Sequence, residues 1–153
     1  MTPEEMRAAF DEHREAESRR DLPAVIATFS QDCFLENVAL GLRSDGPHAV
    51  LRAYQGLFSA FPDLAPEDEG IAFGDDVLVS WGWVSGTMEG PWLGVEPTGR
   101  GFRAAFTNVV PFSGGRMRGE KLLFDLADMC AQLGLDVEDL RARAAELRGT
   151  TAG

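Results

Sequence analysis

The spacing of hydrophobic and polar positions changes near residue 64, and this change separates two kinds of predicted element. Before that point apolar residues recur at helical spacing. Residues 2–20 carry them at i, i+4 and i+7, and a short second helix is expected over residues 22–29. A third helix is predicted from about 47 to 61, where the following proline ends it.

Strands dominate the remainder of the chain. The first is expected early, over residues 33–40, because apolar and polar side chains alternate there. Turn signals at 74–76 and 113–115 then separate longer alternating segments. These later strands are predicted at residues 65–73, 76–89, 101–112 and 116–125. Helical pieces at 126–133 and 136–148 close the chain, and this order of elements is typical of an α+β fold with helices on one face of a curved sheet.

Length and charge narrow the possible partners. A chain of 153 residues favours a single domain over residues 1–153. The net charge of −11 argues against nucleic acid and anionic membranes, because both require a basic face. We expect a cytoplasmic protein, since no signal peptide and no apolar run of membrane-spanning length is visible. Cys33 and Cys130 lie in no metal-binding pattern and are expected to be free thiols.

Period two assigns the faces of the strands, and we expect the rows rich in aromatic residues to face the helices. A concave sheet covered by helices leaves room for a small-molecule pocket with few polar groups among apolar ones. The strand residues predicted to line this cavity are Trp81, Trp83, Phe106, Asn108, Glu120, Leu122 and Phe124.

The carboxylates of the last strand have several possible roles. Glu120 either pairs with Arg118 or Arg103, or faces the cavity, where desolvation would raise its pKa and make it a usable general acid or base. Asp125 stands where the strand gives way to a helix. It is expected to cap that helix, to act in catalysis, or to be exposed.

The two histidines are separated in sequence and give no metal-site signal. His13 shares the apolar face of the first helix, where it is either a satisfied core residue or a titrating group of the site. His48 begins a helix and is expected to be exposed.

An ordered set of short motifs then becomes specific. They run from Asp21-Leu22 and Asp32-Cys33-Phe34, through Tyr54 and Phe61-Pro62-Asp63-Leu64, to Gly86-Thr87, Gly90, Gly94-Val95 and Pro97-Thr98-Gly99-Arg100, and end with Gly115-Arg116-Met117, Glu120, Phe124-Asp125 and Gln132-Leu133-Gly134. The chain resembles the SnoaL-like polyketide cyclase family of the nuclear transport factor 2-like superfamily, which has cone-shaped α+β barrels.

The resemblance implies a core over residues 5–135, with 136–148 as an extra C-terminal helix. That helix carries a narrow apolar stripe that either packs on its own domain or covers a dimer partner. The resemblance further implies a homodimer, a deep pocket for a small hydrophobic metabolite, no metal and no organic cofactor. Characterised relatives resemble aldol-type cyclases, in which an aspartate of the last strand moves the proton, and Asp125 matches that position.

This chain departs from the family pattern at several positions. Met88 and Glu120 stand where many relatives have histidine, Lys121 replaces a common tryptophan, and Leu122 occupies an alternative aspartate position. With the resemblance and these departures taken together, the predicted function is a cofactor-independent cyclase or isomerase. It would act on a hydrophobic, carbonyl-bearing metabolite by carboxylate acid/base catalysis. An epoxide hydrolase-like enzyme using Arg103 and Asp125 and a non-catalytic binding module are the alternatives.

The site residues predicted on this basis fall into two groups. The catalytic group consists of Glu120 as acid/base, Asn108 holding the carbonyl oxygen and Asp125 orienting it. The substrate contacts are predicted at His13, Asn37, Tyr54, Phe58, Phe61, Trp81, Trp83, Phe106, Leu122 and Phe124.

Overall fold

A computed structural model describes residues 1–151, so the last two residues of the predicted 1–153 domain lie outside the described part. The helices are α1 (Pro3–Ser18), α2 (Leu22–Ala27), α3 (Pro47–Ala60), α4 (Leu126–Leu133) and α5 (Val137–Thr151). The strands are β1 (Phe29–Asn37), β2 (Leu42–Asp45), β3 (Ala65–Gly74), β4 (Val77–Thr87), β5 (Gly101–Ser113) and β6 (Arg116–Phe124).

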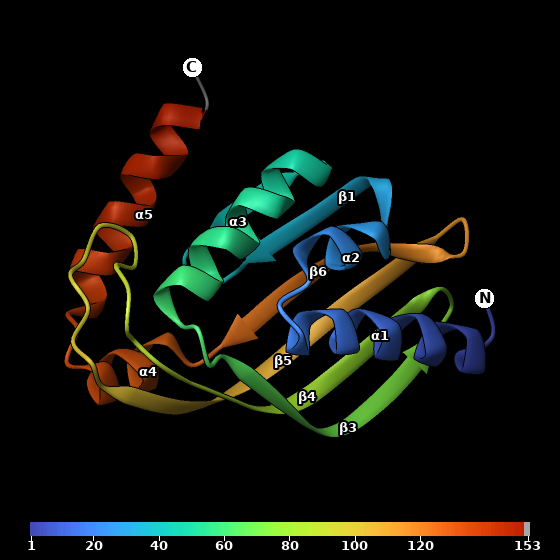
Figure 1. The fold of residues 1–153 in the computed structure, drawn as a ribbon, viewed down its shortest axis with the longest axis horizontal. Helices are drawn as coiled ribbons and strands as arrows, with labels where there is room; N and C mark the ends of the chain where they lie inside the picture. Colours follow the sequence, from blue (N-terminus) through green and yellow to red (C-terminus); the bar gives the residue numbers. More distant parts are fainter. Residues whose placement is uncertain (152–153) are drawn as a thin grey trace.

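All six strands form one sheet in the order β2-β1-β6-β5-β4-β3. β1 runs parallel to β6, and the other neighbouring strands are antiparallel. The sheet is curved and, within the described residues, open, with β2 and β3 as its edges. Helices α1, α2 and α3 lie over one face, and α4 and α5 stand at the end far from the N-terminus (Figure 1). The predicted α+β class is confirmed.

Local signals place the helix ends where the sequence predicted them. Thr2 and Glu5 form a reciprocal capping box at α1, which satisfies backbone N–H groups that would otherwise lack partners. Asp21 caps α2 through a single hydrogen bond that its carboxylate accepts from the Ala24 N–H, and α3 ends before Pro62. The early strand is shifted from the predicted 33–40 to Phe29–Asn37, and the edge strand β2 was missed because it is only four residues long.

The register of β4 overturns one expectation about the strand faces. Residues opposite each other in a ladder project to the same side, and Ser80 pairs with Asn108 while Trp81 pairs with Thr107. Trp81 and Trp83 therefore point to the outer face, and the prediction that they line the cavity is wrong.

Local contacts let the outer face accommodate these large rings. Trp81 is 41% exposed and lies across Gly70, where a Cβ atom would come within 2.2 Å of the ring. The Trp83 indole N–H donates to Glu69 Oε1 at 2.8 Å, and Arg103 stacks on the indole at 4.2 Å. Aromatic character alone therefore did not decide the face of β4.

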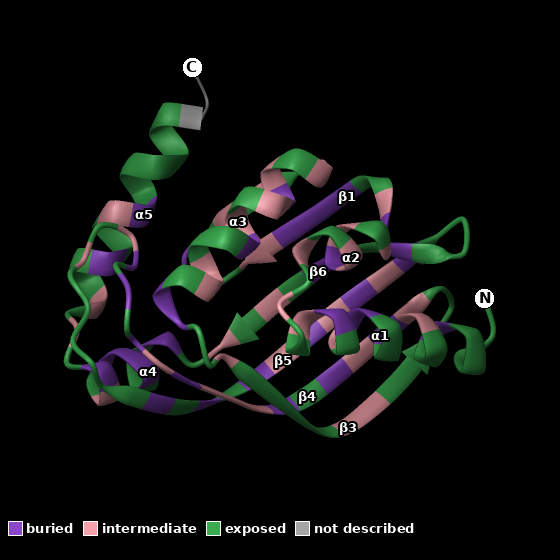
Figure 2. Cartoon of the chain, in the orientation of Figure 1, coloured by how far each residue is buried: buried purple, intermediate pink, exposed green. Residues whose placement is uncertain are grey.

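Two groups of buried apolar side chains fill the interior, and Figure 2 marks the buried residues in purple along the ribbon. One lies under α1 and α2 and includes Phe10, Val25 and Tyr54. The other lies under α4 and α5, where Leu140 and Ala144 are fully buried. The stripe of α5 therefore packs on its own domain, although Leu147 is 46% exposed. Cys33 and Cys130 are buried free thiols, as predicted, and none of the described helices is long and apolar enough to cross a membrane.

Candidate functional site

A cavity of about 390 Å³ lies between the concave face of the sheet and the helices. Its wall is mostly aliphatic and aromatic, and it extends to the segment Pro91–Leu93 that precedes β5. The predicted substrate-contact residues that line it are Asn37, Tyr54, Phe58, Phe61, Phe106, Leu122 and Phe124. A small number of polar side chains in such a wall is the usual layout of a small-molecule site.

Glu120 is the predicted carboxylate that the fold places in this wall, which Glu17 of α1 also lines. It shares the concave face of β6 with Leu122, lines the cavity, and is 2% exposed. Its Oε2 accepts a hydrogen bond from the Tyr54 hydroxyl, and its Oε1 accepts one from Asn108 Nδ2 at 2.6 Å. The two oxygens are thereby held in one orientation.

His13 lies directly behind Tyr54 and Glu120, on the side away from the cavity. It projects from α1, has no exposed surface, and does not line the cavity. Its Nδ1 lies 2.8 Å from Thr28 Oγ1, and its Nε2 lies 3.2 Å from the Tyr54 hydroxyl. The same Nε2 is 3.6 Å from Glu120 Oε2 and 3.5 Å from Glu17 Oε1. The predicted substrate contact at His13 is thus replaced by contacts with the polar residues of the wall.

The charges of these groups shift their pKa values in opposite directions. Burial alone would lower the pKa of His13, but Glu120 and Glu17 raise it from 6.5 to about 9. Burial likewise would raise the pKa of Glu120, but the positive charges of His13 and Arg14 and the Tyr54 hydrogen bond lower it from 4.5 to about 2. The prediction of a raised Glu120 pKa is wrong, because the cationic neighbours outweigh desolvation.

Tyr54 remains a neutral phenol between these charges. Its burial, together with the negative charges of Glu120 and Glu17, raises its pKa well above the ordinary value. The cluster therefore holds an imidazolium, a phenol and a carboxylate in a row at neutral pH.

Arginines in the cavity wall were missed by the sequence analysis. Arg14 bridges Glu17 at 3.2 Å and Asp68 at 3.3 Å, and it lies over the Phe106 ring. The i, i+3 spacing of Arg14 and Glu17 on one helix was the available signal for Arg14.

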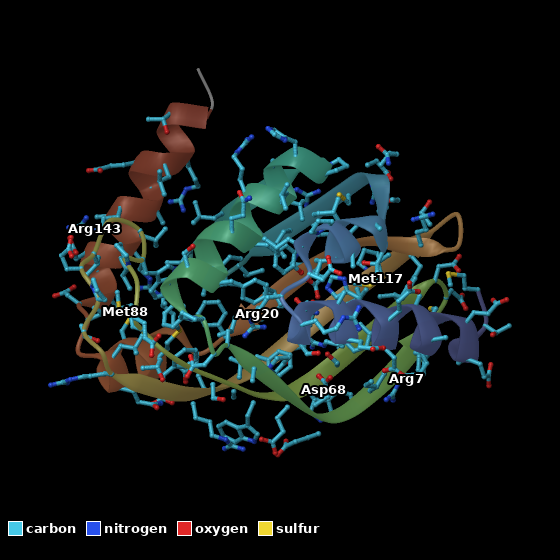
Figure 3. The ribbon with its side chains drawn as sticks, in the orientation of Figure 1. Arg7, Arg20, Asp68, Met88, Met117 and Arg143 are labelled. Atoms are coloured by element: carbon cyan, nitrogen blue, oxygen red, sulfur yellow. The ribbon has the colours of Figure 1, made fainter. Side chains whose placement is uncertain are left out.

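Arg20 ties two parts of the cavity rim together. Its guanidinium stacks on Phe58 at 4.1 Å and donates to the carbonyl oxygens of Pro62 and Leu64. Figure 3 shows it between α3 and the start of β3. Its role here is to hold the rim, since its hydrogen bonds go to backbone carbonyls.

Asp125 and Asn108, which were predicted to be catalytic, do not face the cavity. Asp125 is exposed and caps α4 by accepting the Asp128 N–H at 2.9 Å, so the capping alternative is confirmed. Asn108 is fully buried behind Glu120 and outside the cavity lining, so its amide orients the carboxylate instead of meeting a substrate carbonyl.

One set of side chains in the described part of the chain has the atoms to hold a metal ion. The ligand atoms of His13, Glu17 and Glu120 lie within 4.8 Å of one another. His13 Nε2, which faces both carboxylates, also lies 3.2 Å from the Tyr54 hydroxyl and so already has a hydrogen-bond partner within the cluster.

Comparisons with known proteins agree with this architecture. A family model described as SnoaL-like polyketide cyclase matches residues 5–133. The structure is similar to AclR of Streptomyces galilaeus, a proposed hydroxylase, with 23% identity, 87% of each chain covered and a TM-score of 0.73. It is also similar to IdmH of Streptomyces antibioticus, a proposed polyketide cyclase, with 25% identity, 84% of this chain and 97% of that chain covered and a TM-score of 0.68.

A third similar structure is a Catenulispora acidiphila protein with a ketosteroid isomerase-like fold. The identity is 14%, the coverage is 90% of this chain and 98% of that chain, and the TM-score is 0.74. A search of curated proteins found no match.

Proposed function

The chain belongs to the SnoaL-like polyketide cyclase family, and from this premise we propose that it is a cofactor-independent cyclase-like or isomerase enzyme. The proposed substrate is a hydrophobic, carbonyl-bearing metabolite. The observation that carries the proposal is Glu120, a carboxyl group at 2% exposure in the wall of an otherwise mostly apolar cavity, whose low pKa keeps it ionised at neutral pH. The structural similarity to IdmH and AclR supports a cyclase-like role.

Glu120 would act as the general base. Hydrogen bonds from Tyr54 and Asn108 hold its carboxylate in position, so it would not need to reorient to accept a proton from a carbon next to a carbonyl. The aromatic wall around it, which includes Phe58 and Phe106, would hold a flexible substrate in a folded shape. Such positioning converts an encounter into an effectively unimolecular step, worth several kcal/mol of the barrier.

Exchange of substrate protons for deuterium tests this function without knowledge of the natural substrate. A panel of hydrophobic β-diketones and β-ketoesters is incubated in D₂O, and deuterium at the activated carbon and cyclised products are followed by NMR. Glu120→Gln keeps the size and one hydrogen-bond acceptor, and we expect it to lower the exchange rate by at least about 100-fold.

The matched control is Glu12→Gln on the exposed face of α1. It should exchange at the wild-type rate, while circular dichroism should show both variants folded. Equal rates for Glu120→Gln and wild type would reject Glu120 as the base. Ligand binding by NMR titration without any exchange would instead support the binding-module alternative.

The structure does not favour the epoxide hydrolase alternative built on Arg103 and Asp125. Arg103 pairs with Glu67 at 3.7 Å and stacks on Trp83 at the outer face, and Asp125 caps α4. Neither side chain lines the cavity. Diol formation from a panel of epoxides, run beside the exchange assay, provides the corresponding test.

We also propose that the protein forms a homodimer through the outer face of the sheet. Trp81 and Leu123 are 41% and 38% exposed there, with Thr107 between them, and the partly exposed Val79 and Val109 lie side by side in the neighbouring row. Arg103 and Glu67 on the same face pair with each other at 3.7 Å, so these two charges offset each other within the face.

Trp81→Glu should convert the dimer to a monomer, because each interface would then bury two uncompensated carboxylates. Light scattering coupled to size-exclusion chromatography measures the mass. Phe73→Ser is the control: Phe73 is equally exposed at 40%, but it pairs with Leu78 and so belongs to the other face. A Trp81→Glu variant that stays dimeric would place the interface elsewhere.

A further inference from the structure

The hydrogen-bond donors and acceptors around His13 determine where its protons lie. The Thr28 hydroxyl donates to the Val25 carbonyl at 2.6 Å, so its oxygen accepts from His13 Nδ1–H at 2.8 Å. The Tyr54 hydroxyl donates to Glu120, so its oxygen must accept from His13 Nε2. In this arrangement both ring nitrogens carry protons, so His13 is an imidazolium opposite the Glu120 carboxylate.

The same heavy-atom positions satisfy a second arrangement of protons. If Glu120 Oε2 carries a proton, it donates to the Tyr54 oxygen, and the Tyr54 hydroxyl then donates to a neutral His13 Nε2. The two arrangements differ by one proton shift along each hydrogen bond. Nδ1 keeps its proton and its Thr28 partner in both, and no side chain needs to move.

We propose that His13, Tyr54 and Glu120 form a proton relay in which Tyr54 is the acid that meets the substrate and His13 is the buried positioning residue that resupplies its proton. The relay rests on the proposed function, because it completes the acid half of a reaction for which Glu120 is the base. Tyr54 and Glu120 line the cavity, whereas His13 has no exposed surface and reaches the substrate only through them.

The relay conserves every proton in an aldol-type closure. Glu120 takes the proton from the carbon beside the carbonyl, so that the C–H bond breaks, an O–H bond forms and the electron pair becomes an enolate. Once Glu120 is neutral, the Tyr54 hydroxyl is released from it. When the enolate carbon attacks a second carbonyl, the new alkoxide takes the Tyr54 proton while the Nε2 proton of His13 passes to the tyrosine oxygen.

The cycle closes without solvent or a co-reactant. It leaves a neutral His13 and a protonated Glu120, and one shift through Tyr54 restores the imidazolium and the carboxylate. Because the pKa of His13 is about 9 and that of Glu120 is about 2, His13 is protonated and Glu120 is ionised over the whole neutral range, as the relay requires. Environments that separate two pKa values in this way are characteristic of paired acid and base groups.

A second carboxylate near His13 offers its proton a route that competes with the one through Tyr54. Glu17 on α1 lies 3.5 Å from Nε2 and also lines the cavity, but Arg14 holds it at 3.2 Å. From β1 the Phe29 ring packs edge-on against the imidazole at 4.9 Å and brings no charge. Glu17 is thus the one described carboxylate besides Glu120 within ion-pair distance of His13, and it serves as the control.

Nitrogen-15 NMR of the His13 ring tests the relay without a substrate. His48→Gln, at an exposed position, leaves His13 as the single histidine of the chain and removes any ambiguity of assignment. At pH 7.5 both ring nitrogens should show the protonated shift, and in Glu120→Gln the Nε2 signal should become that of a neutral ring. A neutral His13 in the otherwise wild-type protein would overturn the relay, whatever the fate of the cyclase proposal.

The path through Tyr54 is tested in the same background. Tyr54→Phe keeps the ion pair at 3.6 Å but removes the bridging hydroxyl, so exchange of the Nε2 proton with D₂O should become several-fold slower, while Glu17→Gln should not slow it. Unchanged exchange in Tyr54→Phe, or slowed exchange in Glu17→Gln alone, would overturn the relay.

The steady-state kinetics of a β-diketone or β-ketoester that the protein cyclises test the relay during catalysis. Wild-type kcat should decline above about pH 9, as His13 deprotonates, and addition of EDTA should have no effect. Tyr54→Phe should retain Glu120-dependent deuterium exchange but lose cyclisation by at least about 100-fold. Loss of exchange in Glu120→Gln with normal cyclisation in Tyr54→Phe would leave the proposed function standing and reject the relay.

Discussion

Replacing Glu120 by alanine is expected to lower the free energy of unfolding by about 3–5 kcal/mol. The substitution removes the Glu120 carboxylate that lies 3.6 Å from the fully buried His13 ring and leaves Glu17 at 3.5 Å. It also leaves the Tyr54 hydroxyl and Asn108 Nδ2 without their acceptor in a buried environment. Breaking a buried ion pair and leaving buried donors without an acceptor each cost more than the intact interaction contributes.

Urea denaturation at pH 6.5 measures this effect, and Glu120→Gln should cost less because the amide oxygen still accepts a hydrogen bond. The control is Glu15→Ala on α1, whose carboxylate is 71% exposed and pairs only with Arg19, so the loss should stay within about 0.5 kcal/mol. A double variant with His13→Ala should be less destabilised than the sum of the single variants, because removal of either partner already breaks the pair. Strict additivity would mean that His13 and Glu120 are not energetically coupled.

The stability of the protein is expected to decline as the pH rises from about 6.5 through 9. His13 has a folded-state pKa of about 9 and an unfolded value of 6.5, so the folded state binds its proton more tightly. The resulting stabilisation is complete below pH 6.5 and is lost as the pH rises through 9, because the unfolded state has already released the proton. The difference corresponds to a stabilisation on the order of 3 kcal/mol.

The acidic limb has the opposite sign. The pKa of Glu120 is lowered to about 2 from 4.5, so its contribution is present above pH 4.5 and is lost as the pH falls toward 2. The ion pair is therefore most stabilising between about pH 4.5 and 6.5. Urea midpoints at pH 6, 7.5 and 9 should fall in wild type and change little in His13→Gln. A wild-type curve flat from pH 6 to 9 would mean that His13 is not a buried cation.

These two effects and the proton relay depend on the same ion pair. The separation of pKa values that stabilises the fold also keeps the base ionised and the acid protonated at neutral pH. A variant of His13 should therefore change stability and the pH profile together. Variants of Asp125 should change stability through the cap of α4 and leave the cavity chemistry unaltered.

The sequence by itself determined the class of fold, most helix ends and much of the cavity wall. The caps at Thr2 and Asp21 are local interactions between residues three apart, so they require no knowledge of the tertiary structure. The period-two pattern of β5 and β6 likewise placed Phe106, Glu120 and Leu122 on one face.

Only the tertiary structure decided which face of β4 is concave and what sign the pKa shifts have. The face of Trp81 depends on its register against Thr107, which is 26 positions away along the chain. The state of Glu120 depends on His13 and Tyr54, which α1 and α3 bring against β6. Electrostatic interactions and hydrogen bonds depend on distance in space, and the spacing of residues along a sequence does not contain that distance.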